Sequence, residues 1–206
     1  MRPVVAPLAL AAVILAAAPA SAAMLGDSSL SYHAWRTVTV DGRQYSGPAY
    51  HEKGHERHEQ DLLGMRGVFL LDDVTAQGIL VLPAVKTEVD FPLPALLAEL
   101  DAPDLTRHPD GTEEIAGLAT TKYRIDHIAK DGSRADGYLW ITRAGVLAKL
   151  DVAVTRAHGG RPMKIAMELS HVEPGPVDPA LFQVPKDYSH LPADALGTFL
   201  GSAPAK

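Results

Sequence analysis

The chain has 206 residues, of which 47% are hydrophobic and 21% charged, so it can bury a core of its own and a single domain is expected. It carries 25 acidic against 19 basic side chains, a balance that argues against a nucleic acid partner, because affinity for phosphates rests on clustered lysine and arginine. It has no cysteine, which excludes disulfides and a cysteine-linked lipid.

The first 22 residues have the features of a secretory signal peptide. Arg2 precedes an apolar run over residues 7–19, and Ala20-Ser21-Ala22 supplies a small-residue cleavage site. The run is shorter than the roughly 20 residues that span a bilayer, and no later stretch is apolar enough to span one. We therefore expect residues 1–22 to be removed on export to the periplasm, leaving one β domain over residues 23–193 and a loose tail over residues 194–206.

The first half of the mature chain reads as short strands separated by turns. Runs rich in β-branched and alternating apolar residues predict strands over residues 31–40, 44–51, 55–63, 67–71, 78–82 and 85–91. The strand over residues 55–63 is unusually polar. One short helix is predicted over residues 94–100, where a proline precedes good helix formers, and its length suits a lid on a sheet.

The second half predicts further strands, among them residues 122–128 and a three-stranded meander over residues 135–172. Its last two strands alternate apolar and polar side chains about a Gly159-Gly160 turn, which is typical of an antiparallel hairpin with one buried face. The inward set is Val146, Ala148, Leu150, Val152, Val154, Met163, Ile165, Met167 and Leu169. The predicted fold is mainly β, an antiparallel open sheet or half-barrel with one or two short lid helices.

One motif could carry metal chemistry. His51-Glu52-Lys53-Gly54-His55 matches H-E-x-x-H, in which two histidines one helical turn apart bind zinc and the glutamate acts as general base. That geometry requires a helix, whereas the flanking sequence predicts a strand, a Lys53-Gly54 turn and a second strand, with His55 and His58 on opposite faces. A zinc-dependent metallohydrolase using this segment is therefore the alternative function, and no metal or other cofactor is expected in the favoured one.

Several spaced segments resemble a family of small exported bacterial proteins. They are Glu52-Lys53-Gly54, the run over residues 82–88, the run over residues 115–123, Gly137-Tyr138-Leu139-Trp140-Ile141-Thr142 and the ending over residues 176–188. Together they resemble an uncharacterised periplasmic family related to the outer-membrane lipoprotein carriers and receptors of the LolA and LolB type. The resemblance implies a half-barrel whose concave apolar face shelters acyl chains under short helices, and in which an arginine, Arg57 or Arg66 here, bonds to the lid.

The expected function is non-enzymatic: binding of a lipid, a lipoprotein acyl chain or another hydrophobic molecule on the concave face, with an envelope protein as a further candidate partner. The expected lining residues are Tyr123, Ile125, Trp140, Leu150, Val152, Ile165, Met167 and Leu169. This list depends on the strand register, because a slip of one residue reverses every side chain. The ending is expected to act as a latch, with Asp178 capping a turn at Pro179 and Phe182 returning to the sheet.

Overall fold

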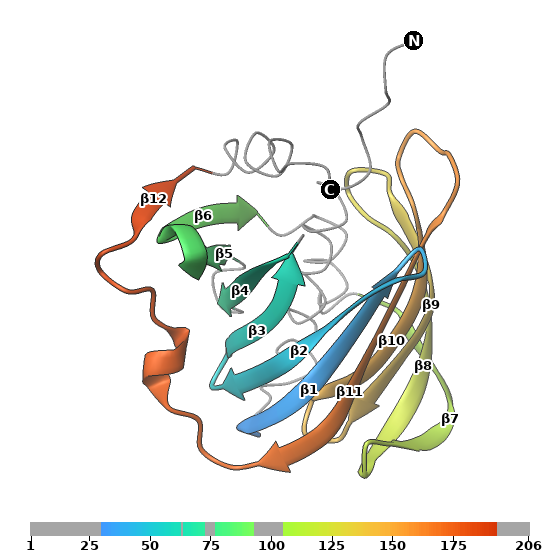
Figure 1. Cartoon of the computed structure of the whole chain (residues 1–206). Coiled ribbons are helices and arrows are strands. Elements are labelled where there is room, and N and C mark those ends of the chain that lie inside the picture. The colour runs from blue at the N-terminus through green and yellow to red at the C-terminus, as the bar shows by residue number, and fades with distance from the viewer. Residues whose placement is uncertain (1–29, 63, 73–76, 93–104, 193–206) are drawn as a thin grey trace.

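The computed structural model describes residues 30–62, 64–72, 77–92 and 105–192, which form twelve strands in one sheet (Figure 1). The order across the sheet is β12-β6-β5-β4-β3-β2-β1-β11-β10-β9-β8-β7, and all neighbours are antiparallel except β12 and β6. The strands are β1 (Tyr32–Val40), β2 (Arg43–Glu52), β3 (His55–Leu62), β4 (Met65–Asp72), β5 (Gln77–Leu82), β6 (Thr87–Pro92), β7 (Arg107–Ile115), β8 (Leu118–Ile128), β9 (Arg134–Thr142), β10 (Leu147–Thr155), β11 (Met163–Pro174) and β12 (Ser189–Leu191).

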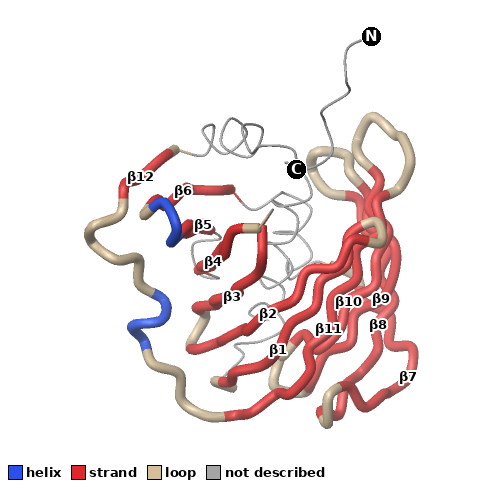
Figure 2. Tube along the Cα trace, in the orientation of Figure 1, coloured by secondary structure: helices blue, strands red, loops and turns tan. Residues whose placement is uncertain are grey.

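The edge strands β7 and β12 do not pair with each other, so the sheet is open, and the predicted fold class is confirmed. Helical structure in the described ranges is limited to two 3-10 turns, η1 (Pro83–Val85) and η2 (Pro179–Phe182), as Figure 2 shows. No helix there is both long enough and apolar enough to cross a membrane. The predicted helix over residues 94–100 lies outside the described residues.

The sheet is strongly curved (Figure 1). Glycines permit two close approaches between its neighbouring strands. A Cβ atom at Gly47 of β2 would overlap the carbonyl oxygen of Glu59 on β3. A Cβ atom at Gly137 of β9, where φ is 155°, would overlap the carbonyl oxygen of Asp151 on β10. Glycine in a strand interior marks such approaches of one backbone to another, and here it lets neighbouring strands coil.

The alternation of side chains along each strand gives the sheet a buried inner face and an outer face. In β1, for example, every second residue from Tyr32 to Val40 is buried. One large apolar cluster joins inner residues from β1, β3 to β6 and β8 to β11. The prediction that Ala148 shares this face is wrong, because the register shifts between Leu147 and Lys149, and Ala148 packs with Trp140 on the outer face.

The segment after β11 forms a strap, residues 175–188, that runs past β3 and η1 to β12 (Figure 1). The Oδ1 atom of Asp178 accepts a 2.9 Å hydrogen bond from the backbone N of Ala180, and Pro179 begins η2, as predicted for the latch. Val184 and Tyr188 pack on the outer-face cluster of β4 and β5, which consists of Val68, Leu70 and Val81 with Ile79. The strap therefore covers part of the outer face, not the inner one.

Candidate functional site

Seven of the eight predicted lining residues lie together on the inner face. Cross-strand pairing sets them in rows: Ile125, Gly137, Val152, Ile165 and Val40 form one, and Tyr123, Leu139, Leu150, Met167 and Val38 form the next. Leu169 lies beside Arg36 in a third row. All seven belong to the large apolar cluster, Tyr123 as a partly buried member. These strands therefore carry a continuous set of buried apolar side chains on their inner face, and the role of that face in ligand binding stays a prediction.

Trp140 is the exception, and the prediction that it points inward is wrong. Leu139 and Ile141 belong to the inner cluster, so the residue between them in β9 faces out, where Trp140 packs against Ile115 and Ala148. Lys149 lies over its ring, with the Nζ atom 5.1 Å from the ring centroid. The aromatic character of Trp140 suggested a lining role, but the two-residue period of the strand decides its direction.

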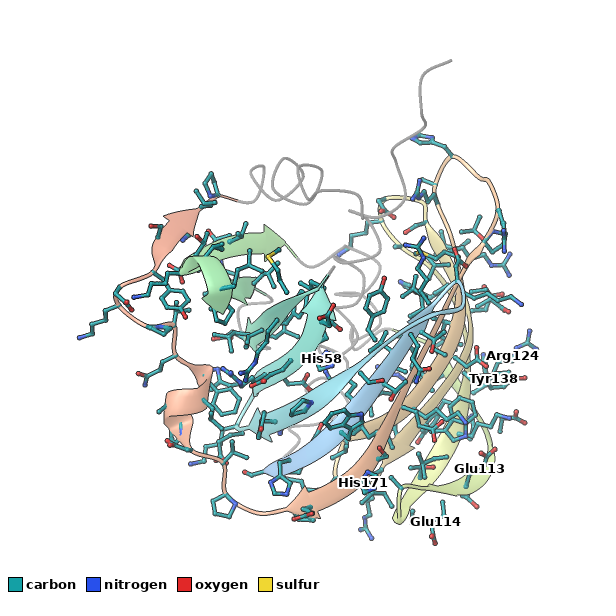
Figure 3. The ribbon with its side chains drawn as sticks, viewed as in Figure 1. His58, Glu113, Glu114, Arg124, Tyr138 and His171 are labelled. Atoms are coloured by element: carbon teal, nitrogen blue, oxygen red, sulfur yellow. The ribbon has the colours of Figure 1, made fainter. Side chains whose placement is uncertain are left out.

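A polar cluster interrupts the inner face on β1 and β3. We call Arg36, Glu56, His58 and Gln60 the polar centre; all four are buried. The Nη2 atom of Arg36 donates a 3.1 Å hydrogen bond to Oε2 of Glu56, and the two side chains are 2% and 1% exposed. Figure 3 shows His58 within the curve of the sheet, while Tyr138 and Arg124 lie on its outer side.

Several polar atoms of this centre have no hydrogen-bond partner among the described residues. They are Nε and Nη1 of Arg36, both ring nitrogens of His58, both amide atoms of Gln60 and Oε1 of Glu56. A buried polar group without a partner costs roughly 1–3 kcal/mol, more when it is charged. Native proteins seldom keep several such groups together unless a bound molecule or a function uses them.

Burial also shifts the acid–base behaviour of the centre. Loss of hydration, together with the nearby Arg36 guanidinium, lowers the pKa of His58 well below its usual value, so the imidazole is neutral. Burial raises the pKa of Glu56, although the charges of Arg36 and His51 oppose this shift. Burial alone would lower the pKa of Arg36, but the interactions of its guanidinium with Glu56 and Tyr32 are stronger than this effect and raise the pKa. The centre therefore holds one ion pair beside two neutral polar side chains.

Small residues lie between Arg36 and the β3 side chains of the polar centre. Ala34 of β1 pairs with Ala49 of β2, which pairs with His58. Arg36 pairs with Gly47, and a Cβ atom there would lie 3.6 Å from the Cα atom of Gln60, so no side chain separates Arg36 from the strand that carries Gln60. On the β2 side the polar side chains thus meet only methyl groups and a glycine, whereas on the β4 side His58 pairs with Phe69 and Glu56 with Leu71.

Sequence reasoning missed the polar centre. One signal was present, because Arg36 lies at the same two-residue period as Ala34, Val38 and Val40 and so shares their inner face. The run His55-Glu56-Arg57-His58-Glu59-Gln60 offered no such signal, since both faces of β3 are polar there. Its inward residues are evident only from the pairing of β3 with β2 and β4.

The zinc-binding motif does not form. His51 lies near the end of β2 on the inner face, where its ring stacks on Tyr32 and its Nδ1 atom is 3.0 Å from the carbonyl oxygen of Leu30. Glu52 faces outward and accepts a 3.2 Å hydrogen bond from the backbone N of Val177, and His55 is exposed on the outer face. The two histidines lie on opposite faces, and the described residues hold no group of three or more potential ligands arranged for a metal.

Arg57 and Arg66, the arginines expected at the lid, also lie on the outer face. The Nη1 atom of Arg57 donates a 2.8 Å hydrogen bond to the carbonyl oxygen of Leu181 in the strap. Arg57 and Arg66 both pair with Glu59. Arg57 therefore fastens the strap to the sheet, and the part expected of it at a lid over residues 94–100 falls outside the described residues.

No protein-family model and no curated protein matches the sequence. Among solved structures, the complex of MucA and MucB from Pseudomonas aeruginosa matches with a TM-score of 0.51 at 13% identity, over 82% of this chain and 60% of that one. An uncharacterized conserved protein from Thermus thermophilus matches with a TM-score of 0.48 at 13% identity, over 77% of this chain and 90% of that one. A LolA superfamily protein from Nitrosomonas europaea matches with a TM-score of 0.40 at 10% identity, over 86% and 98%.

The likeness to the MucA and MucB structure shows a shared fold, and this chain spans about three fifths of the matched chain there. The curved, open antiparallel sheet is the architecture that the resemblance to the LolA family implied. The open half-barrel predicted from the sequence is therefore confirmed as the fold. Identities this low carry no conclusion about ligand or partner.

Proposed function

We propose that this is an exported envelope protein that binds a hydrophobic or amphipathic molecule, such as a lipid or a lipoprotein acyl chain, on the inner face of its sheet, without catalysis. In this proposal residues 1–22 are cleaved on export to the periplasm and residues 23–193 form the binding domain. The observation that carries it is the pair of uninterrupted apolar rows across β8, β9, β10, β11 and β1.

The form of the sheet supports a carrier more than an enzyme. A strongly curved sheet with one apolar face offers an elongated surface that fits an alkyl chain. The predicted catalytic motif is divided between two faces, so His51 and His55 are not placed to bind one zinc ion together. The matched MucB structure is a complex with MucA, and by analogy we extend the proposal to an envelope protein as a second class of partner.

Native mass spectrometry of the protein purified from the periplasm, with minimal detergent and no chelator, tests the proposal directly. We expect a mass that begins after residue 22 and carries an adduct of lipid size, which is lost on denaturation. A protein that remains free of adducts after incubation with total membrane lipid would argue against the proposal. A single stoichiometric zinc ion that is lost in His55→Ala would instead favour the hydrolase.

A pair of variants on one strand assigns the binding face. Leu150→Phe places a larger side chain on the inner face of β10, whereas Ala153→Phe places the same side chain on its outer face. We expect Leu150→Phe to weaken displacement of a hydrophobic fluorescent probe by lipid about tenfold or more, and Ala153→Phe to leave it unchanged. Circular dichroism checks that both variants keep the sheet, and equal effects of the two would refute the inner-face assignment.

A further inference from the structure

The polar centre has the properties of a recognition site for a negatively charged or carbonyl-bearing group. Two of the three guanidinium nitrogens of Arg36 are buried and without a partner among the described residues, and the amide nitrogen of Gln60 is a further unused donor. A buried cation that keeps free donors is satisfied best by an oxygen that accepts several hydrogen bonds. The imidazole of His58, which carries one N–H when neutral, adds another donor.

The polar centre also lies beside the apolar rows, where a ligand with an alkyl chain would place its polar end. Arg36 is next to Leu169 in one row, and the row of Val38, Met167, Leu150 and Leu139 runs directly beside it. An apolar chain on that row therefore has one end within the polar centre. Gly47 and Ala49 of β2, the strand between Arg36 and the side chains of β3, place no more than a methyl group between the donors of the centre.

We propose that the polar centre binds the carboxyl group of a long-chain carboxylic acid whose alkyl chain lies along the apolar rows of β9, β10 and β11. This inference rests on the proposed function and names its ligand class. Arg36 and Gln60 donate to the carboxylate oxygens, and His58 completes the donor set from the neighbouring row. Glu56 holds Arg36 in place through the 3.1 Å bond.

The charge balance of the centre is compatible with this occupant. With Arg36 paired to Glu56, a second carboxylate adds one negative charge to a buried site, which is costly unless a proton is taken up. Because burial raises the pKa of Glu56, this carboxyl accepts a proton more readily than an exposed glutamate does. An ester of the same acid has no charge and gains less from Arg36, so the site should discriminate between the two.

Competition between palmitic acid and methyl palmitate for a bound hydrophobic fluorescent probe tests the proposal on the delipidated, full-length mature protein. We expect the wild type to prefer the acid by about tenfold or more. The double variant Arg36→Met with Glu56→Leu replaces the ion pair by apolar side chains and avoids a lone buried charge. It is expected to bind the ester as the wild type does and to lose the preference for the acid.

Two further variants keep the test decisive. Gln60→Met leaves the ion pair intact and is expected to reduce the preference for the acid over the ester several-fold. This variant tests the site even if the double variant does not fold. Arg124→Met removes an exposed arginine from the outer face and should change nothing. Equal binding of acid and ester by the wild type, or a preference that survives in the double variant, would overturn the inference and leave the proposed function standing. Failure of both ligands to bind would overturn both.

Discussion

At the scale of single residues, burial of His58 on the inner face makes the stability of the protein depend on pH. The pKa of His58 is lowered well below its ordinary 6.5, first by loss of hydration and then by Arg36. The unfolded chain therefore binds more protons than the folded one below pH 6.5, and the stability that neutral His58 contributes is lost as the pH falls through this range. The slope is about 1.4 kcal/mol per pH unit for one proton.

Thermal melts at pH 7.5 and 5.5 measure this contribution. We expect the wild type to lose more stability between these values than His58→Gln, which cannot take up a proton. Glu56 has the opposite effect on stability, because a raised pKa makes the folded state more stable as the pH falls. Both proteins contain Glu56, so this effect is the same in both. The difference between the two proteins therefore isolates His58, and parallel pH profiles would contradict its assignment as a buried neutral group.

At the scale of elements, the close approach of β2 to β3 depends on Gly47. In Gly47→Ala the added methyl group overlaps the carbonyl oxygen of Glu59, which is backbone and cannot rotate away. We expect a loss of about 1–3 kcal/mol in the free energy of unfolding, measured by urea denaturation. Gly42→Ala is a different kind of control, since nothing lies within 4 Å of its Cβ position and any loss there comes from its positive φ alone.

The strap is an element whose attachment can be measured separately. Phe182 is half-buried and its ring lies 6.0 Å from that of His55, so Phe182→Ala should cost less than the 3–5 kcal/mol of a fully buried phenylalanine, at about 1–2 kcal/mol. The corresponding change at an exposed apolar residue, Ile128→Ala, should leave the melting temperature unchanged. A Phe182→Ala protein as stable as the wild type would mean that η2 adds nothing to the fold.

The strand elements were largely predictable from sequence because alternation and Gly turns specify them locally. The predicted strand over residues 44–51 corresponds to β2, and the one over residues 55–63 to β3, with the turn at Lys53-Gly54 between them. The failures occurred where pairing overrides the local pattern. The register shift in β10 turns Ala148 outward, and Trp140 follows the alternation of β9, whatever its chemical type.

At the scale of the whole molecule, the sequence indicated an open antiparallel sheet with one apolar face but not the polar centre within it. From its sequence alone, a polar strand such as β3 is predicted to lie at a solvent-exposed edge of the sheet. Only its place between β2 and β4, near the middle of the sheet, makes His58 and Gln60 interior residues. Strand order is set by contacts between distant segments, which a local pattern does not contain.

The pairing of β1 with β11 near the centre of the sheet has a consequence for how the chain folds. The strands β1 to β6 can pair with one another as they are synthesised. One edge of β1 stays unpaired until β11 is present, because Val40 pairs with Ile165 across this edge. Pairings over such separations form slowly, and an exposed strand edge is prone to intermolecular association meanwhile. Refolding should therefore be slow and strongly concentration-dependent, and a chain truncated before β11 should aggregate instead of forming half of the sheet.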